Sequence, residues 1–124
     1  MSSSFLTKID LNFVQIEIYK RYALLTIKDD VLFDLPKLEK LFEVFDEYYP
    51  EETFGYISNR KFAFSVNPIC YIGIANHPRL RSIAIFCHKK STFTNAQFEK
   101  AFYKRPFGVF YTLEECEHLV NSHL

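Results

Sequence analysis

The sequence predicts an α/β fold with the element order ββαβαβαβα: a mostly parallel five-stranded sheet with an antiparallel edge hairpin and four helices. An alternating apolar and polar stretch and a second β-rich run follow each other near the N-terminus, and three later apolar runs have the length of strands. Helical patterns separate these later runs. Strands that alternate with helices favour a parallel sheet with right-handed crossovers.

The edge hairpin is predicted from two β-rich runs. Residues Phe13–Tyr19 alternate, with Val14, Ile16 and Ile18 on one face. The second run, Tyr22–Lys28, follows directly after two basic residues. No Asn-Gly or Asp-Gly pair joins the runs, so we expect an irregular turn rather than a tight primed one.

The first helix is predicted between Asp34, as its N-cap, and Pro50, which ends it. Pro36 fits the first turn, where its missing N–H costs little. Apolar side chains recur at helical spacing and form one stripe: Leu35, Leu38, Leu41, Phe42, Phe45 and Tyr49.

The middle of the chain contains two buried strands and a short helix. Strand 54–58 runs into polar residues, and Asn67 with Pro68 then marks the start of a helix that extends to about Asn76. This helix is apolar nearly all round, so we expect it to be mostly covered. Leu80–His88 is a continuous apolar run, typical of a central strand buried on both faces.

Two capping boxes divide the C-terminal third. Thr94 with Gln97 predicts a helix from Asn95 to about Lys104, with Phe93 and Phe98 as a hydrophobic staple. Pro106–Tyr111 reads as a short strand. Thr112 with Glu115 opens a last helix, whose apolar face consists of Leu113, Cys116, Leu119 and Val120.

Length and composition predict one domain over residues 1–124, with residues 1–10 as a candidate disordered segment. No apolar run approaches the ~20 residues that span a bilayer, and no secretion signal is visible, so we expect a cytoplasmic protein without a transmembrane segment. Lys and Arg number 15, as do Asp and Glu, which argues against a nucleic-acid partner. The cysteines Cys70, Cys87 and Cys116 are expected to be free, buried thiols.

No catalytic motif is present, so we expect a protein that is not an enzyme and uses no cofactor or metal. Cys87 and His88 are neighbours on a strand, where they point to opposite faces and cannot form a nucleophile–base pair. Glu114 and His118 are one helical turn apart, and two ligands seldom make a metal site.

Polar residues at the carboxyl end of the third strand form the candidate contact or anion site. They are Ser58, Asn59, Arg60, Ser65 and Asn67. Ligands of open α/β sheets bind at such strand ends, and a helix N-terminus adds N–H donors beside Arg60. The same residues also have a purely structural interpretation, in which Asn67 caps the helix and Ser65 closes a turn. Phosphorylation of Ser65 is a further alternative.

The element order and the phrases FGYISNR, SVNP and RPFGVFYTLEE resemble small bacterial proteins of the SpoIIAA-like group. Anti-sigma-factor antagonist (STAS) domains and CRAL-TRIO lipid-transfer domains share that fold. The resemblance implies a SpoIIAA-like, STAS-like domain in which Ser65 falls at about the position of the phosphorylated switch serine. Here Ser65 lies between Phe64 and Val66, without the Asp and Gly that flank that serine. The lipid-transfer branch implies an apolar cavity beneath a mobile helix.

We therefore predict a non-enzymatic STAS-like regulatory or protein-interaction module, which binds a protein partner or forms a homodimer through the Ser58–Pro68 loop and the neighbouring helix. The alternative is a carrier or sensor of a small apolar or lipid-like ligand, held between aromatic helices and the sheet. Aromatic residues of this kind are more often core than ligand cage, but so many on two helices could also line an apolar groove or a dimer face. They are Phe42, Phe45, Tyr48, Tyr49, Phe98, Phe102 and Tyr103.

Overall fold

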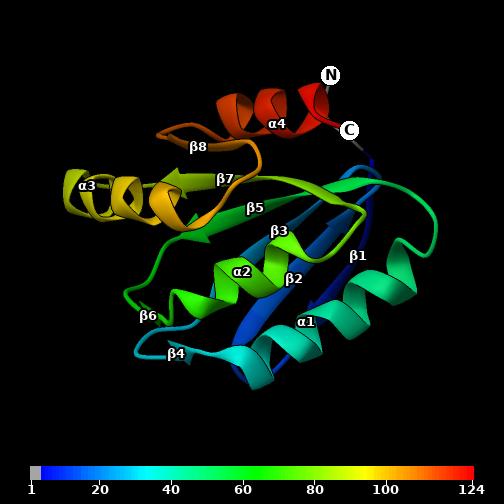
Figure 1. Cartoon of the computed structure of the whole chain (residues 1–124), viewed down its shortest axis with the longest axis horizontal. Coiled ribbons are helices and arrows are strands. Elements are labelled where there is room, and N and C mark those ends of the chain that lie inside the picture. Colours follow the sequence, from blue (N-terminus) through cyan, green and yellow to red (C-terminus); the bar gives the residue numbers. More distant parts are fainter. Residues whose placement is uncertain (1–3) are drawn as a thin grey trace.

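The computed structural model describes residues 4–124, which form a main six-stranded sheet, a small two-stranded sheet and four α-helices (Figure 1). The main sheet has the order β1-β2-β3-β5-β7-β8. Its strands are β1 (Phe5–Asp10), β2 (Val14–Tyr19), β3 (Tyr22–Ile27), β5 (Phe54–Arg60), β7 (Leu80–Cys87) and β8 (Phe107–Phe110). The small sheet pairs β4 (Leu32–Phe33) with β6 (Ser65–Val66). The helices are α1 (Leu35–Tyr48), α2 (Ile69–Ala75), α3 (Lys90–Glu99) and α4 (Leu113–Ser122), and a 3-10 helix, η1 (Lys100–Phe102), follows α3.

The predicted hairpin is confirmed as β2–β3, and the sheet is parallel from β3 to β8. The five-strand count and the disorder of residues 5–10 were wrong, because these residues form β1, which pairs antiparallel with β2. Most β1 side chains are exposed, and the strand is bound to the sheet by backbone hydrogen bonds to β2. Its sequence therefore lacks the alternation of apolar and polar residues that marks a half-buried strand. The part of that prediction on residues 1–3 lies outside the described residues.

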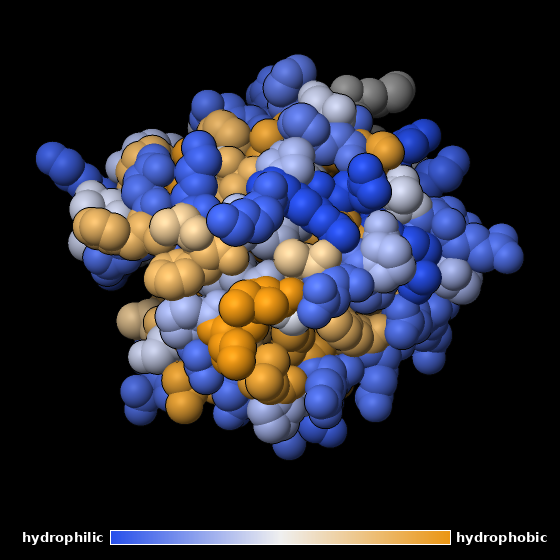
Figure 2. All heavy atoms as spheres, viewed as in Figure 1, coloured by the Kyte–Doolittle hydropathy of each residue, from blue (hydrophilic) through white to orange (hydrophobic). Residues whose placement is uncertain are grey.

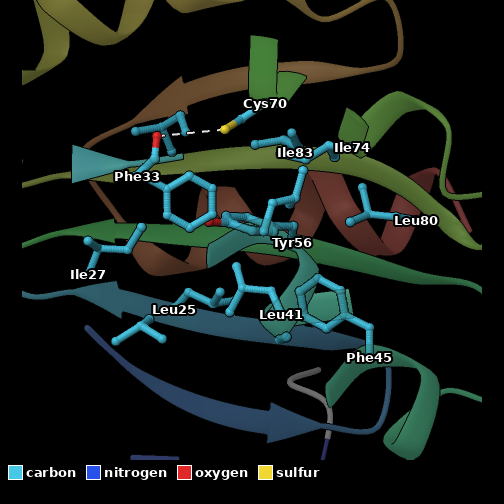
Figure 3. Close-up of a cluster of buried hydrophobic side chains, with 14 of the residues drawn as sticks. Leu25, Ile27, Phe33, Leu41, Phe45, Tyr56, Cys70, Ile74, Leu80 and Ile83 are labelled. Carbon is cyan, nitrogen blue, oxygen red and sulfur yellow. Dashed lines mark hydrogen bonds between the residues drawn. The ribbon is translucent and has the colours of Figure 1, made fainter. Parts of the chain in front are cut away.

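Helices α1, α2 and α3 cover one face of the sheet, and α4 covers the other. The connections from β3 to β5, from β5 to β7 and from β7 to β8 each move one strand further toward the same edge of the sheet. Right-handed crossovers in one direction place their helices on the same face. Figure 3 shows the resulting core, in which Leu25, Tyr56 and Ile83 of the strands face Phe45 of α1 and Ile74 of α2. On the other face, Cys116 and Val120 of α4 pack against β3, β5 and β7.

Helices α1 and α4 begin where their caps predict. Asp34 Oδ1 accepts a hydrogen bond from Lys37 N at 3.3 Å, and Thr112 Oγ1 accepts one from Glu115 N at 3.2 Å. The capping box at Thr94 was a wrong prediction, because α3 begins at Lys90 and contains Thr94. Phe93 lies inside the helix and stacks on Tyr111 at 4.6 Å between ring centroids, so it is no staple before the helix.

Helix α2 forms close to the predicted residues, but it is not mostly covered as predicted. Cys70, Tyr71 and Ile74 are buried, whereas Ile69 and Ile72 are exposed. The reason is that α2 belongs to the outer layer, so only one side of it packs against the sheet. The three cysteines are free and buried, as predicted. Within residues 4–124, no helix is long and apolar enough to cross a membrane.

Candidate functional site

Strand β5 extends to Arg60, two residues beyond the predicted end, and this divides the candidate site between the two faces of the sheet. Ser58, Asn59 and Arg60 are therefore strand residues and not loop residues. Because successive side chains of a strand point to opposite faces, Ser58 and Arg60 lie on the side of α2 and α3, and Asn59 lies on the side of α4. The structure does not bring all five candidate residues together.

Arg60 forms a nearly buried ion pair with Glu99, the last residue of α3. Its Nη1 and Nη2 atoms each donate to one Glu99 carboxylate oxygen at 2.8 Å, which is the bidentate geometry that Arg favours. The exposed fractions of the two side chains are 10% and 17%. Arg60 Nε donates to Ser58 Oγ at 2.8 Å, and the guanidinium carbon lies 4.8 Å from the centre of the Phe64 ring. Burial alone would lower the pKa of Arg60, but the hydrogen bonds and charge of Glu99 raise it above its ordinary value.

Tyr71 joins this network from α2. Its phenol donates to Glu99 Oε1 and lies 3.5 Å from Arg60 Nη2. Burial, together with the charge of Glu99, raises the pKa of Tyr71 well above its ordinary value, so the phenol remains a donor. We call Ser58, Arg60, Tyr71 and Glu99 the Arg60 network. It connects β5, α2 and α3. Its hydrogen bonds occupy Nε, Nη1 and Nη2 of Arg60, the donors that would otherwise bind an anion.

A small apolar cavity lies against the Arg60 network. It measures about 20 Å³ and is lined mainly by strand and α2 side chains, among them Phe33, Tyr56, Phe64 and Cys70. One water needs about 10–15 Å³ measured in this way, so the cavity has room for one water. Ligand pockets of drug-sized molecules measure about 300–1,000 Å³. The described structure therefore holds no space for a lipid-sized molecule at this point.

Asn59 forms a separate polar chain across the carboxyl ends of the strands. Its Nδ2 donates to Thr26 Oγ1 at 3.1 Å, and its Oδ1 lies 2.6 Å from Nε2 of His88. His88 is exposed, whereas its neighbour Cys87 is fully buried. The two therefore point to different faces, as the sequence predicts, and form no nucleophile–base pair. Within residues 4–124, no group of three or more His, Cys, Asp and Glu side chains is placed to hold a metal ion.

Ser65 and Asn67 lie on the segment that leads into α2. Asn67 Oδ1 accepts a hydrogen bond from Ile69 N at 3.2 Å. The predicted cap at Asn67 was nevertheless wrong by one residue, because α2 begins at Ile69 with Pro68 as its N-cap and has no side-chain cap. Ser65 is exposed in β6, and its N–H donates to Val31 O at 2.9 Å, so it lies in the small sheet and not at the helix start. Phosphorylation of Ser65 stays a prediction.

An exposed apolar surface is a feature that the sequence indicated only in part. It consists of Leu35, Ile69, Ile72, Phe98 and Phe102, and we call it the apolar surface. Ile72 is 61% exposed and Phe98 is 72% exposed. Figure 2 shows the most hydrophobic part of this face over α2, with further apolar side chains toward α3. The sequence named Phe98 and Phe102 as candidate lining residues, but it did not predict that Ile69 and Ile72 are exposed, because an α2 that is apolar on all sides also suits a buried helix.

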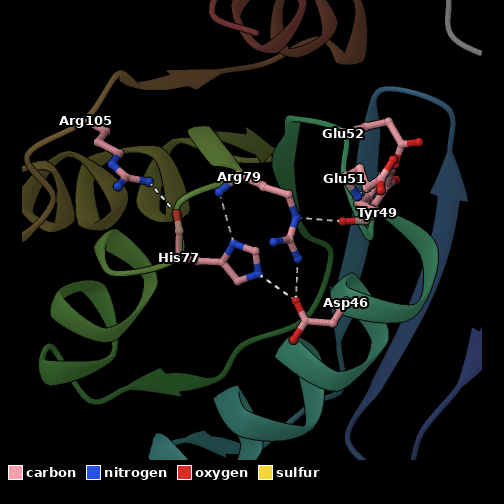
Figure 4. Close-up of polar contacts among 7 residues, drawn as sticks. All are labelled: Asp46, Tyr49, Glu51, Glu52, His77, Arg79 and Arg105. Carbon is pink, nitrogen blue, oxygen red and sulfur yellow. Dashed lines mark hydrogen bonds and ion pairs between the residues drawn. The ribbon is translucent and has the colours of Figure 1, made fainter.

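A second polar cluster surrounds His77, at the opposite end of β5 and β7 (Figure 4). Arg79 N donates to His77 Nδ1 at 3.3 Å, so the neutral ring carries its proton on Nε2, which lies 3.2 Å from Asp46 Oδ1. The same Asp46 atom accepts from Arg79 Nη2 at 2.6 Å, and Arg105 donates to the His77 carbonyl. The ring packs against Phe42, with centroids 4.9 Å apart. The cluster thus connects α1 to the start of β7.

Replacing His77 by Gln is expected to make the free energy of unfolding less sensitive to a fall in pH than it is in the wild type. Burial lowers the pKa of His77 below its ordinary value of 6.5, although Asp46 acts in the opposite direction. The neutral ring therefore contributes fully above the unfolded-state pKa, and this contribution is lost as the pH falls through the folded-state pKa. Urea unfolding at about pH 7.5 and about pH 5 should show the wild type losing more stability than His77→Gln. An equal loss in both proteins would contradict a depressed pKa.

Comparison with known proteins identifies the fold. No family model matches the chain, and no curated protein matches it. The structure is similar to that of an uncharacterised protein of the DUF3478 family with a SpoIIAA-like fold, from Shewanella loihica PV-4. The TM-score is 0.54, the similarity covers 94% of this chain and 93% of that one, and the sequence identity is 6%. At this identity the similarity shows the fold alone, and it confirms the predicted SpoIIAA-like fold.

Proposed function

Starting from the SpoIIAA-like fold, we propose that this chain is a non-enzymatic regulatory or protein-interaction module whose contact surface is the apolar surface. The exposure of Ile72 on α2 and of Phe98 on α3, two helices that cover the same face of the sheet, is the observation that carries the proposal. Isolated apolar residues are normal on protein surfaces, but a group of five large ones on one face is typical of a binding site.

The contact surface lies beside the Ser58–Pro68 segment rather than within it. The polar groups of Ser58 and Arg60 are occupied by the Arg60 network, so they are poor candidates for direct contact. Ser65 and Asn67 are exposed and lead directly into Ile69. A charge added at Ser65 would therefore lie near the contact surface, which is a simple route to regulation.

The cavity between α2 and the sheet is too small for the predicted apolar ligand, which favours an interaction module over a carrier that binds its ligand there. A space of about 20 Å³ holds one water, and Phe45, Tyr49 and Tyr103 fill the core with their own rings. The aromatic side chains predicted to line a ligand site thus divide into two groups. Some form the core, and Phe98 and Phe102 belong to the apolar surface.

Replacing Ile72 by Asp, or Phe98 by Asp, is expected to weaken partner binding about 30-fold or more, the effect of losing an interface hot spot of about 2 kcal/mol. Both side chains are exposed, so the variants should unfold at nearly the wild-type temperature. Quantitative mass spectrometry after cross-linking and affinity capture from a lysate of the source organism measures the loss.

His118→Asp is the matched control, because it adds a negative charge to the exposed side of α4 on the other face of the sheet. It should recover the same partner as the wild type. Recovery of one unchanged set of proteins by all four samples would show that the apolar surface is not the contact surface.

A further inference from the structure

Four of the five side chains of the apolar surface, all except Leu35 of α1, lie in a strongly basic part of the chain. Residues 60–105 contain nine Lys and Arg side chains and one acidic side chain, Glu99. The Glu99 carboxylate is already bound by Arg60 and Tyr71. Of the basic side chains, Arg79 pairs with Asp46, and Arg105 donates hydrogen bonds to backbone carbonyls. Six basic side chains then have no acidic partner within residues 4–124: Lys61, Arg81, Lys89, Lys90, Lys100 and Lys104.

Two of these basic side chains border the apolar surface. Lys100 lies in η1 between Phe98 and Phe102, and Lys104 follows two residues after Phe102. Figure 2 shows strongly hydrophilic residues directly beside the hydrophobic area. A ligand of this surface must therefore combine apolar groups with negative charge.

The apolar side chains form two rows. Ile69 and Ile72 lie three residues apart on α2, and Phe98 and Phe102 lie four residues apart on α3 and η1. Tyr71 lies between the rows, because it belongs to α2 and its phenol reaches Glu99 of α3. It is only 5% exposed, so its ring lies below the molecular surface. An apolar stripe with the same three- and four-residue spacing, as on an amphipathic helix, fits between two such rows.

We propose that the apolar surface binds an acidic amphipathic helix of a partner protein, an inference that rests on the proposed function. A second copy of this chain is a poor occupant, because face-to-face pairing would bring the basic borders together. This chain also offers no such helix within its described residues. Its acidic helix, α1, buries its apolar stripe of Leu38, Leu41 and Phe45 in the core.

The test uses the full chain and defined peptides. The first peptide, the Glu peptide, is a helix of about 18 residues with Leu at helical spacing on one face and Glu on the other. The matched Lys peptide has Lys in place of every Glu. Fluorescence anisotropy should give the Glu peptide a dissociation constant at least about tenfold lower. Raising the salt from about 0.1 M to about 1 M should weaken its binding, because the Debye length falls from about 10 Å to about 3 Å.

Variants locate the charge effect. Lys100→Glu with Lys104→Glu should weaken binding of the Glu peptide about tenfold and improve binding of the Lys peptide. Lys8→Glu with Lys20→Glu reverses the same number of charges on β1 and the β2–β3 turn, and should change neither. Vesicles of phosphatidylcholine with and without phosphatidylserine test an anionic membrane surface.

Equal binding of both peptides, or binding only to the phosphatidylserine vesicles, would overturn the inference. If neither peptide binds while Ile72→Asp still abolishes recovery of the cellular partner, the acidic-helix inference fails and the proposed function stands. If Ile72→Asp leaves that recovery unchanged, the proposed function itself fails.

Discussion

Replacing Arg60 by Met is expected to lower the free energy of unfolding by about 3–5 kcal/mol, the usual cost of breaking a buried ion pair by removing one partner. Glu99 would lose both 2.8 Å hydrogen bonds while its side chain stays only 17% exposed. Ser58 Oγ would lose its bond from Arg60 Nε as well. Urea unfolding followed by circular dichroism at neutral pH measures the change.

A double variant separates the charge from the packing. Replacing both Arg60 and Glu99 by Met removes the carboxylate that has lost its cation and keeps much of the buried volume, so we expect most of the lost stability to return. If the free energy of unfolding of Arg60→Met lies within about 0.5 kcal/mol of the wild-type value, the pair contributes no more than an exposed salt bridge. That result would contradict a buried pair.

Replacing Tyr49 by Ala is expected to cost about 3–5 kcal/mol, as for other large buried aromatic side chains. The Tyr49 ring is 1% exposed and stacks on Phe54, with the centroids 4.3 Å apart. Its hydroxyl lies 2.6 Å from Tyr19 O and 2.7 Å from Tyr22 O, so it bridges the two ends of the β2–β3 turn. Chemical unfolding of the purified variant gives the value.

Tyr49→Phe is the matched control, since it keeps the ring and removes only the hydroxyl. It should cost about 1–3 kcal/mol, because it leaves carbonyl groups of the turn without their donor. If Tyr49→Phe costs as much as Tyr49→Ala, the hydrogen bonds rather than the ring packing hold this turn. If Tyr49→Ala costs less than about 1 kcal/mol, the site collapses around the lost ring and our account is wrong.

The elements that the sequence predicted well are those with a local physical cause. Asp34 and Thr112 supply acceptors to helix N–H groups three residues away, so α1 and α4 begin where the caps indicate. β7 is a continuous apolar run because it lies inside the sheet. β1 has no such cause within itself, since it depends on the free edge of β2.

The sequence indicated only part of the Arg60 network. Ser58 and Arg60 lie together because they share one face of β5, which the strand period dictates. Their partner Glu99 lies 39 residues beyond Arg60, on a helix whose start the capping box at Thr94 placed five residues too late. A salt bridge between distant segments follows no fixed spacing in the sequence, so the contact between Arg60 and Glu99 could not be predicted.

The sequence by itself determined the α/β class, the order of the central elements and the position of a polar strand end at Ser58–Arg60, because periodicity and capping act over a few residues. Only the tertiary structure decided that Arg60 faces inward to Glu99 and that Ile69 and Ile72 face outward. Helix α2 is apolar on every side, so its own residues do not choose which side is buried. The choice is made by the sheet, which packs against one side of α2 and leaves the other side exposed.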